Sequence, residues 1–313
     1  MEVKSTKFWG HQSYHCRYTW LTKGVLACAE DSHVFREDDA LVRLGVGKNM
    51  VDAIRHWCMA TQVLEEDPTI DNNRGSYLRP TDLGRRIFLG NGRWDPYLED
   101  AGTVWLLHYL LATNPDWATT AYYAFNEMAG LEFSRDSLQR DLVELDTRIS
   151  SRRSSENSIR RDVNVFVRTY VSSQDGAGGS VEDLLDCPFA ELGLVREDPD
   201  HSTYAFSRGY QQSLPDVVVL YAIWSYAKAK EVQQTFTFDE LAYQPLGPGR
   251  VFKLDERALA ERLEELAKQT AGAIQLTETA GYRQVLITQD FDPLEALDRY
   301  YEHRWGEDSS GRA

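Results

Sequence analysis

The sequence predicts a mainly α-helical fold with small β wings, organised as tandem winged helix-turn-helix units. The first observation is the run 39–57, in which two segments of helical spacing are joined by a turn containing Gly45 and Gly47. The second is the turn-rich, strand-like segment 67–79, which follows those helices as a wing would. The third is a similar order of helix, helix and hairpin between residues 237 and 288. In such a unit the second helix lies in a DNA groove, so the pattern indicates a nucleic-acid-linked protein.

Length and composition allow more than one packed unit. The 313 residues, of which 42% are hydrophobic and 12% aromatic, supply material for two or three cores and exclude a disordered chain. We expect four parts: an N-terminal winged helix-turn-helix with an aromatic opening segment at 1–95, a helical middle domain with a basic segment at 96–175, an acidic C-terminal winged-helix-like domain at 180–305 and a disordered tail at 306–313.

Membrane and secreted classes are not indicated. No apolar run is long enough to cross a bilayer, and the first residues do not form a signal peptide. The cysteines include no CxxC pair and are expected to be buried, reduced thiols: Cys16, Cys28, Cys58 and Cys187. These features favour a cytoplasmic protein with no membrane contact.

The charge is acidic and uneven. The net charge of −15 excludes wrapping of DNA by the whole surface. Residues 1–161 carry 20 Lys and Arg against 23 Asp and Glu, a net of −3, whereas residues 162–313 carry 14 against 26, a net of −12. A local basic face in the first half is therefore expected to bind DNA with salt-sensitive affinity, and the acidic half is suited to protein partners.

The first helix-turn-helix carries groups suited to a DNA groove. Gly45 and Gly47 tolerate positive φ and are expected to end one helix and aim the next. Helical spacing then predicts a buried face of Met50, Ile54, Trp57 and Cys58, which leaves Lys48, Asn49, Asp52, Arg55 and His56 on the other side. Asn reads adenine, Arg reads guanine and Lys neutralises phosphate, so we favour DNA contact over a purely structural helix pair.

A wing and further helices follow. Segment 67–79 supplies Arg74 and Arg79 as wing residues, and Thr81 is expected to cap a helix that begins near Asp82. Residues 97–130 are helical and aromatic. A second helix of recognition type is expected from residue 133 to 149, capped by Ser134.

The most basic segment surrounds residues 148–161. Its arginines are Arg148, Arg152, Arg153, Arg160 and Arg161. Two interpretations are equally favoured. One is a patch that follows phosphates, and the other is a solvated loop balanced by the carboxylates Glu144, Asp146, Glu156 and Asp162.

The C-terminal half repeats the order of helix, helix and hairpin. A flexible connection is expected at Gly176–Ser180. The elements expected after it are short strands at 190–195 and 203–206, helices at 216–230 and 255–269, a strand pair at 273–277 and 284–288, and a closing amphipathic helix at 291–305 for core or dimer contacts.

No local catalytic signature is present. The chain has no phosphate-binding loop, no HExxH, no GxSxG and no dinucleotide fingerprint, so any catalysis would use residues from distant segments. His11 is the candidate general base or metal ligand, with Arg17 and Lys23 on a phosphate. The alternative, which we favour, is that His11 forms a hydrogen bond in a packed aromatic corner and Arg17 pairs with a carboxylate.

The opening segment and first helix-turn-helix resemble a bacterial family of unknown function found in antiphage defence cassettes. The resemblance covers about the first quarter of the chain. The residues that carry it are Phe8, Gly10, His11, Tyr14, Arg17, Trp20, Leu21, Lys23 and Gly24, followed by Leu44-Gly45-Val46-Gly47-Lys48-Asn49-Met50-Val51, Ile54, Arg55 and Trp57. The family includes the SspB DNA nickase of single-strand DNA phosphorothioation systems.

The resemblance implies a protein that nicks one DNA strand so that sulfur can replace a phosphate oxygen, with Mg or Mn as cofactor. It also implies partners: double-stranded DNA, a cysteine desulfurase and an ATP-pyrophosphatase-type sulfur-transfer protein, with a homodimer as a further expectation. A non-catalytic DNA-binding regulator and an assembly adaptor of the defence complex are the alternatives. The residues expected to contact DNA are Arg17, Lys23, Lys48, Asn49, Arg55, His56, Arg74, Arg79, Arg152, Arg153, Arg160 and Arg161.

Overall fold

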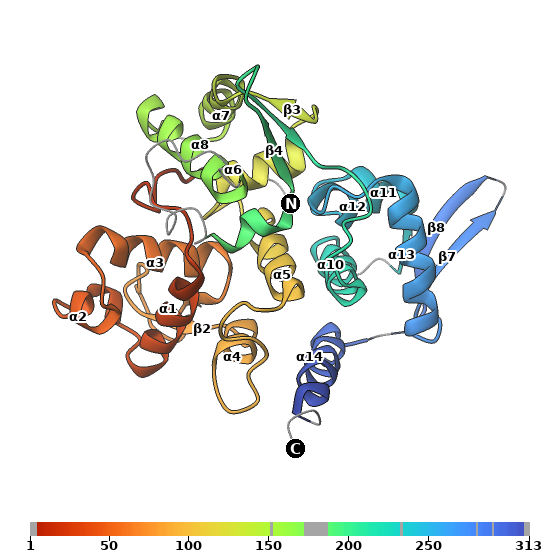
Figure 1. Cartoon of the computed structure of the whole chain (residues 1–313), viewed down its shortest axis with the longest axis horizontal. Helices are drawn as coiled ribbons and strands as arrows, with labels where there is room; N and C mark the ends of the chain where they lie inside the picture. The colour runs from red at the N-terminus through yellow and green to blue at the C-terminus, as the bar shows by residue number, and fades with distance from the viewer. Residues whose placement is uncertain are drawn as a thin grey trace. The chain divides into compact units, whose positions relative to one another are not determined.

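The chain is mainly helical, with small antiparallel sheets (Figure 1). The structure is a computed structural model that describes residues 5–150, 153–171, 187–231, 234–279, 281–289 and 291–309. The chain separates into two compact units, one up to Ser207 and one from Arg208 onward. The helical class and the small β elements are as predicted, and the finer boundaries at 95 and 175 stay predictions.

The first part of the first unit contains the predicted helices, the turn between them and the hairpin. Its elements are α1 (Tyr18–Glu30), α2 (Ala40–Leu44), α3 (Lys48–Ala60), β1 (Leu64–Glu66), β2 (Leu78–Pro80) and α4 (Asp82–Phe88). The strands are antiparallel, with Glu65 opposite Arg79. The predicted cap is confirmed, because the Thr81 hydroxyl accepts a hydrogen bond from the Gly84 N–H.

The two glycines of the turn have different conformations. Gly45 ends α2 in the left-handed region, with φ of 64°. Gly47 has φ of −73° and ψ of 162°, so it starts the next helix without using its tolerance of positive φ. Gly47 is the N-cap of α3, where extended backbone is the ordinary conformation and any residue is sterically allowed. Only Gly45 is required to reverse the chain.

The second part of the first unit is built around an apolar helix. Its elements are α5 (Ala101–Ala112), α6 (Thr119–Tyr122), the π-helical turn η2 (Tyr123–Glu127), β3 (Glu132–Phe133), α7 (Arg135–Ile149), α8 (Glu156–Tyr170), the 3₁₀ helix η3 (Pro188–Leu192), β4 (Val195–Asp198) and β5 (Thr203–Phe206). All residues of α5 except Ala101 are buried, as a helix that is apolar on every side requires.

Local signals around α7 and β4 were partly correct. Ser134 caps α7 in a reciprocal capping box with Ser137, as predicted. The expected strand at 190–195 was wrong except at Val195, because Pro188 starts a 3₁₀ helix that continues to Leu192 and β4 begins only at Val195. Pro is favoured in the first turn of a helix and lacks the N–H that a strand ladder needs. The expected connection at 176–180 lies outside the described residues.

The second unit begins with a long helix and ends with another. Its elements are α10 (Asp216–Ala229), β6 (Thr235–Thr237), α11 (Phe238–Tyr243), α12 (Pro248–Val251), α13 (Glu256–Gln269), β7 (Ile274–Thr279), β8 (Tyr282–Ile287) and α14 (Pro293–Ser309). The predicted helices and the strand pair are confirmed. Of the expected tail at 306–313, residues 310–313 lie outside the described residues.

Two of the sheets have the same topology. In each, a short strand is followed by two or more helices and then by a hairpin, giving the strand orders β3-β5-β4 and β6-β8-β7. The N-terminal part has the same sequence of helices and hairpin. There the Leu78 N–H donates to the Ser32 carbonyl at 2.8 Å, at the position where the other two parts have their first strand. The three parts thus share one order of elements, which no sequence repeat revealed.

A membrane-spanning helix is not found within the described ranges. No helix there combines the length and the apolar character that crossing a bilayer requires.

Candidate nucleic-acid interface

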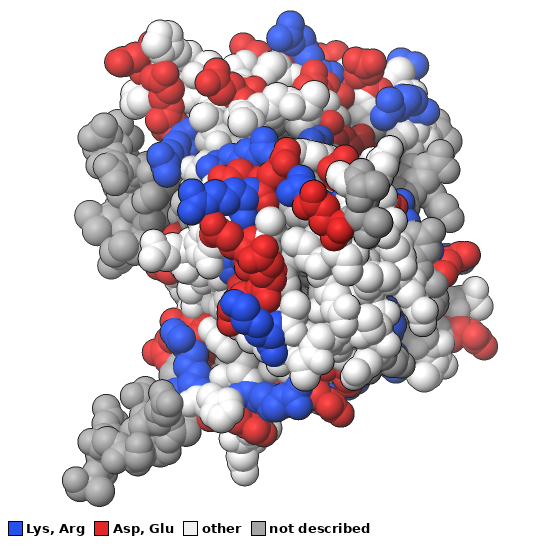
Figure 2. Space-filling model, turned by 90° about the vertical axis from the view of Figure 1, so that its right-hand side faces the viewer, with Lys and Arg blue, Asp and Glu red and all other residues white. Residues whose placement is uncertain are grey.

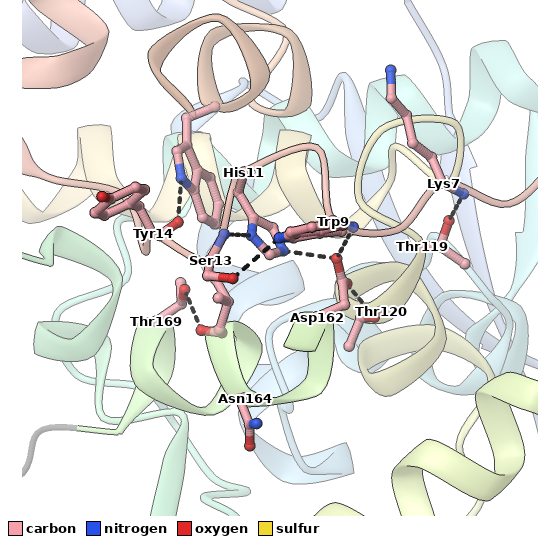
Figure 3. Close-up of polar contacts among 12 residues, drawn as sticks. Lys7, Trp9, His11, Ser13, Tyr14, Thr119, Thr120, Asp162, Asn164 and Thr169 are labelled. Carbon is pink, nitrogen blue, oxygen red and sulfur yellow. Dashed lines mark hydrogen bonds and ion pairs between the residues drawn. The ribbon is translucent and has the colours of Figure 1, made fainter. Parts of the chain in front are cut away.

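A loop near the N-terminus is held against α8 by one buried carboxylate (Figure 3). Asp162 Oδ1 lies 2.7 Å from His11 Nε2 and also accepts the Trp9 backbone N–H at 2.7 Å. Its other oxygen, Oδ2, accepts the Thr120 hydroxyl at 2.6 Å. Asp162 therefore joins the loop to both α8 and α6.

The pKa of Asp162 is lowered despite its burial. Burial alone would raise the pKa, but the His11 ring and the hydrogen bonds from His11, Thr120 and the Trp9 N–H outweigh that effect. The carboxylate is therefore ionised at neutral pH and accepts all three hydrogen bonds.

Both nitrogens of His11 are occupied by the protein. Nε2 is bonded to Asp162, and Nδ1 accepts the Ser13 backbone N–H at 3.2 Å. The ring is 3% exposed and lies against Trp57, at 6.2 Å between ring centroids. In this arrangement no ring nitrogen is left for a substrate or a metal. His11 therefore matches the second interpretation given from the sequence, a histidine that forms hydrogen bonds in a packed aromatic corner. Its role here is to position the loop.

His56 is buried behind the same loop, and its expected exposure on α3 was wrong. Its side chain is only 5% exposed, and its Nδ1 has no hydrogen-bond partner. A Cβ on Gly10 would come within 2.4 Å of that nitrogen, so the loop backbone seals the ring. Burial, and next the neighbouring His11, hold the pKa of His56 well below its ordinary value. A buried, neutral imidazole is not available to DNA phosphate.

The loop carries backbone strain and an exposed indole. Trp9, Gln12 and Ser13 have φ of 63°, 51° and 67°, a region that side-chain-bearing residues rarely adopt. Trp9 is 37% exposed, and its Nε1 donates to Ser13 Oγ at 3.1 Å. The Arg161 guanidinium lies over the indole, 4.4 Å from the ring centroid. Such strain persists only where the surroundings enforce it, as Asp162 does here.

The solvent side of α8 beside this loop carries amides and cations. Asn157, Arg160, Asn164 and Arg168 recur at helical spacing and are exposed or half-buried. Arg160 Nη2 donates to Asn157 Oδ1 at 2.8 Å, and Arg168 Nη2 donates to the Ser13 carbonyl at 2.8 Å. We call Trp9 with these four residues and Arg161 the loop–α8 surface.

The basic segment predicted at 148–161 is only partly within this surface. Arg160 and Arg161 belong to it, and Arg153 is exposed just before α8. Arg152 lies outside the described residues, and Arg148 lies 3.9 Å from Glu127. The structure thus divides a segment that appeared continuous in the sequence.

The residues predicted from the first helix-turn-helix have different environments. Lys48, Asn49 and Arg74 are exposed, at the start of α3 and in the wing loop. Arg79 pairs with Glu65 across the hairpin at 2.8 Å. Arg55 donates to the Gly75 carbonyl at 2.8 Å and so ties α3 to the wing.

Three further cations of this region have structural contacts. Lys23 Nζ donates to the Leu44 carbonyl at 3.2 Å, at the end of α2. The Arg17 guanidinium lies 5.6 Å from the Trp20 ring centroid. Lys7 Nζ lies 2.9 Å from the Trp117 centroid; burial, followed by the Arg55 charge, lowers the pKa of Lys7 to about 8.

Sequence reasoning missed Trp9 and Arg168, and it placed Asp162 among the carboxylates of a solvated loop, whereas the structure buries this side chain. Asp162 had one available signal, since it interrupts the apolar stripe that Ile159 and Phe166 form on α8. A carboxylate in such a stripe is expected to have a buried partner. Its partner His11 is 151 residues away, and no local pattern reveals that pairing.

The described residues do not form a ready-made metal cage. Within them no group of three or more His, Cys, Asp or Glu side chains converges as metal ligands would. Mg²⁺ is commonly held by one or two carboxylates together with substrate phosphates and water, which differs from such a cage. No residue is therefore assigned to a metal here.

Charges of both signs are mixed on the face of the protein that Figure 2 shows. Figure 2 shows one face, on which acidic side chains lie among the Lys and Arg and no large all-basic region appears. With a net charge of −15, binding of a polyanion depends on local surfaces such as the loop–α8 surface.

Comparisons with known proteins agree on one family. The family described as "Protein of unknown function (DUF4007)" matches residues 8–301. The crystal structure of SspB matches with a TM-score of 0.84 and 32% identity, covering 97% of this chain and 90% of that chain. The magnesium ion-bound SspB crystal structure matches with a TM-score of 0.83 and 31% identity, covering 96% and 88%. No curated protein matches the chain.

Proposed function

The chain belongs to the DUF4007 family, and from this premise we propose that it is a DNA-binding component of a bacterial DNA phosphorothioation and antiphage defence system that nicks one DNA strand. The observation that carries the proposal is the likeness to SspB, which at 32% identity extends over 97% of the chain and not only over the opening motifs. The nick would open the backbone for sulfur incorporation.

The repeated order of elements supports the DNA-binding part of the proposal. A short strand, two helices and a hairpin, with the last strand in the middle of the sheet, is the order of a winged helix-turn-helix. On this basis α3, α8 and α13 occupy the position of the helix that enters a DNA groove, so α8 takes the role that the sequence indicated for residues 133–149, which form α7. The proposal thus includes two or three winged units.

The side chains on these three helices distinguish their roles. The start of α3 exposes Lys48 and Asn49, and α8 exposes Arg160 and Arg168. Asn and Arg are the side chains that read base edges, and Lys and Arg neutralise phosphates. We assign DNA contact to α3, with Arg74 of its wing, and to α8.

The partners and cofactor follow from the family setting. Nicking would use Mg or Mn as the metal ion. The magnesium ion-bound crystal structure of SspB is consistent with this choice. A cysteine desulfurase and an ATP-pyrophosphatase-type protein would then deliver the sulfur. A homodimer stays part of the proposal.

The test is relaxation of supercoiled plasmid by the purified chain with Mg²⁺ or Mn²⁺, against EDTA. A matched variant, Lys48→Ala with Arg160→Ala, separates true nicking from a contaminating nuclease, because only nicking by this chain should weaken when DNA contacts are removed. Open-circle product that needs metal and falls in the folded variant supports the proposal. Intact plasmid with a salt-dependent gel shift would assign the chemistry to a partner.

The acidic second unit favours a second candidate, an assembly adaptor of the defence complex. Helix α13 exposes Glu256, Glu261 and Glu264, and this face would repel DNA phosphate. Tight, salt-insensitive binding of a cassette protein, together with weak DNA binding, would support the adaptor over the nickase.

A further inference from the structure

We propose that Trp9 is a stacking platform for an unpaired DNA base, and that the loop–α8 surface holds the DNA strand next to it. This inference rests on the proposed function, since an unpaired or displaced base arises where one strand is opened. It assigns to Trp9 a role different from the groove and phosphate contacts of the winged units.

Trp9 is more exposed than the tryptophans near it. The neighbouring aromatic residues Trp20 and Trp57 are 2% and 4% exposed, whereas Trp9 is 37% exposed. The loop reaches this arrangement through three residues of positive φ, which is unfavourable for residues with side chains. The strained loop buries His11 and covers His56, yet it leaves the Trp9 indole partly exposed, and this exposed aromatic surface points to a ligand.

The Trp9 indole is held in a fixed orientation by three contacts. Its backbone N–H is bound by Asp162, its Nε1 by Ser13 Oγ, and Arg161 lies over the ring. Little side-chain freedom is left to lose when a base stacks on the exposed part of the ring. Arg161 adds positive charge to the stack, which favours a ligand carrying phosphate.

Cations and amides of α8 surround the exposed indole of Trp9. Arg168 contacts the loop through the Ser13 carbonyl, and Arg160 and Asn157 continue along α8. The only acidic side chains of α8 are Glu156, at its first turn, and the buried Asp162. An aromatic ring flanked by cations and amides is the usual arrangement for single-stranded nucleic acid, which is bound by stacking together with phosphate contacts.

The experiment measures binding of the full chain to three fluorescein-labelled DNAs of one sequence: an intact duplex, a duplex with a one-nucleotide gap and a single strand. Trp9→Ala is compared with Trp9→Phe, which keeps a stacking face. The control is Tyr97→Ala, which removes another exposed aromatic side chain, 64% exposed. Anisotropy gives each affinity at one fixed salt concentration.

We expect Trp9→Ala to weaken binding to the gapped duplex and the single strand by about 5- to 100-fold, the range for loss of one base–aromatic stack. Affinity for intact duplex should not change, Trp9→Phe should keep most of the affinity, and Tyr97→Ala should match wild type. Equal losses on all three DNAs, or no loss on the gapped duplex, would overturn the role of Trp9. If wild type still binds duplex and nicks plasmid, the proposed function survives that failure. Wild type that binds none of the DNAs would refute both.

Discussion

Nε2 of His11 lies 2.7 Å from Oδ1 of Asp162, although the two residues are separated by 151 positions in the chain. The pair fastens the strained loop that carries Trp9 to the helix that carries Arg160 and Arg168. Its geometry corresponds to a structural clamp, since each His11 nitrogen and both Asp162 oxygens already have partners. The shape of the loop–α8 surface therefore depends on a buried group that does not itself reach DNA.

Asp162→Ala should destabilise the first unit strongly. The substitution leaves His11 and the Trp9 N–H buried without their acceptor, and breaking a buried pair in this way costs about 3–5 kcal/mol. Urea unfolding followed by tryptophan fluorescence measures the change. The folded fraction should also lose its preference for gapped DNA, because the strained loop is no longer held.

The matched control for that change is Asp198→Ala. Asp198 also pairs with a histidine, His201, at 2.8 Å, but both side chains are largely exposed. Surface pairs of this kind contribute little to stability, so the midpoint of unfolding should hardly move. Equal effects of the two substitutions would show that the His11–Asp162 clamp is unimportant.

Removing arginines beside and on α8 should flatten the salt dependence of DNA binding. Arg153 and Arg160 are exposed and neither contacts the Trp9 loop, so the double variant Arg153→Ala, Arg160→Ala alters charge and leaves the loop in place. Each lost phosphate contact should reduce the slope of log K against log salt by about 1. Titrations between low and moderate salt give the slope.

Arg257→Ala is the control, because Arg257 is exposed on α13 and pairs with Glu261 at 2.7 Å. It removes one cation from the acidic unit, and the slope should equal that of wild type. A slope unchanged in the double variant would remove α8 from the interface. In that case the double variant Lys48→Ala, Arg74→Ala, which removes cations from α3 and its wing and leaves α8 unchanged, should account for the whole reduction in the salt slope.

Stability should fall on mild acidification because of His56. Its folded pKa lies well below the ordinary 6.5, owing to burial and to His11. Below about pH 6.5, His56 therefore binds a proton in the unfolded chain but stays neutral in the native state. The free energy of unfolding then decreases by up to about 1.4 kcal/mol per pH unit as the pH falls. The pKa of Asp162 is lowered as well, so its contribution to stability is also lost on acidification, but only as pH falls below about 3.8.

Unfolding measured between pH 7 and 5 checks this expectation. In His56→Gln the stability curve should be flatter over that range, although the variant is less stable at pH 7. His201→Gln, which changes an exposed histidine, should keep the slope of wild type. A wild-type curve that is level down to pH 5 would contradict a neutral, buried His56.

Local signals predicted most elements but little of the interface. Thr81 and Ser134 were identified as caps because the capping pattern lies within three residues of each helix start. The environment of His56 was not accessible in this way. Its side of α3 is polar by helical spacing, and it is buried because the opening loop covers it at Gly10, 46 residues earlier in the chain. Trp9 was missed for a similar reason, since its exposure depends on a contact with Asp162.

The two glycines of the first helix-turn-helix offer a last test, in which neighbouring substitutions should differ. A Cβ at either position meets no other atom within 4 Å, so crowding cannot explain a difference. Gly45 has φ of 64° and Gly47 has φ of −73°, so Gly45→Ala should lose about 1 kcal/mol of stability from backbone strain alone. Gly47→Ser should be neutral or stabilising, because Gly47 is the N-cap of α3 and a Ser hydroxyl can accept one of its free N–H groups. Thermal unfolding of both variants decides the matter. Equal losses would mean that Gly47 also requires positive φ, and α3 would then start in a different orientation, with Lys48 and Asn49 displaced from the face assigned to DNA.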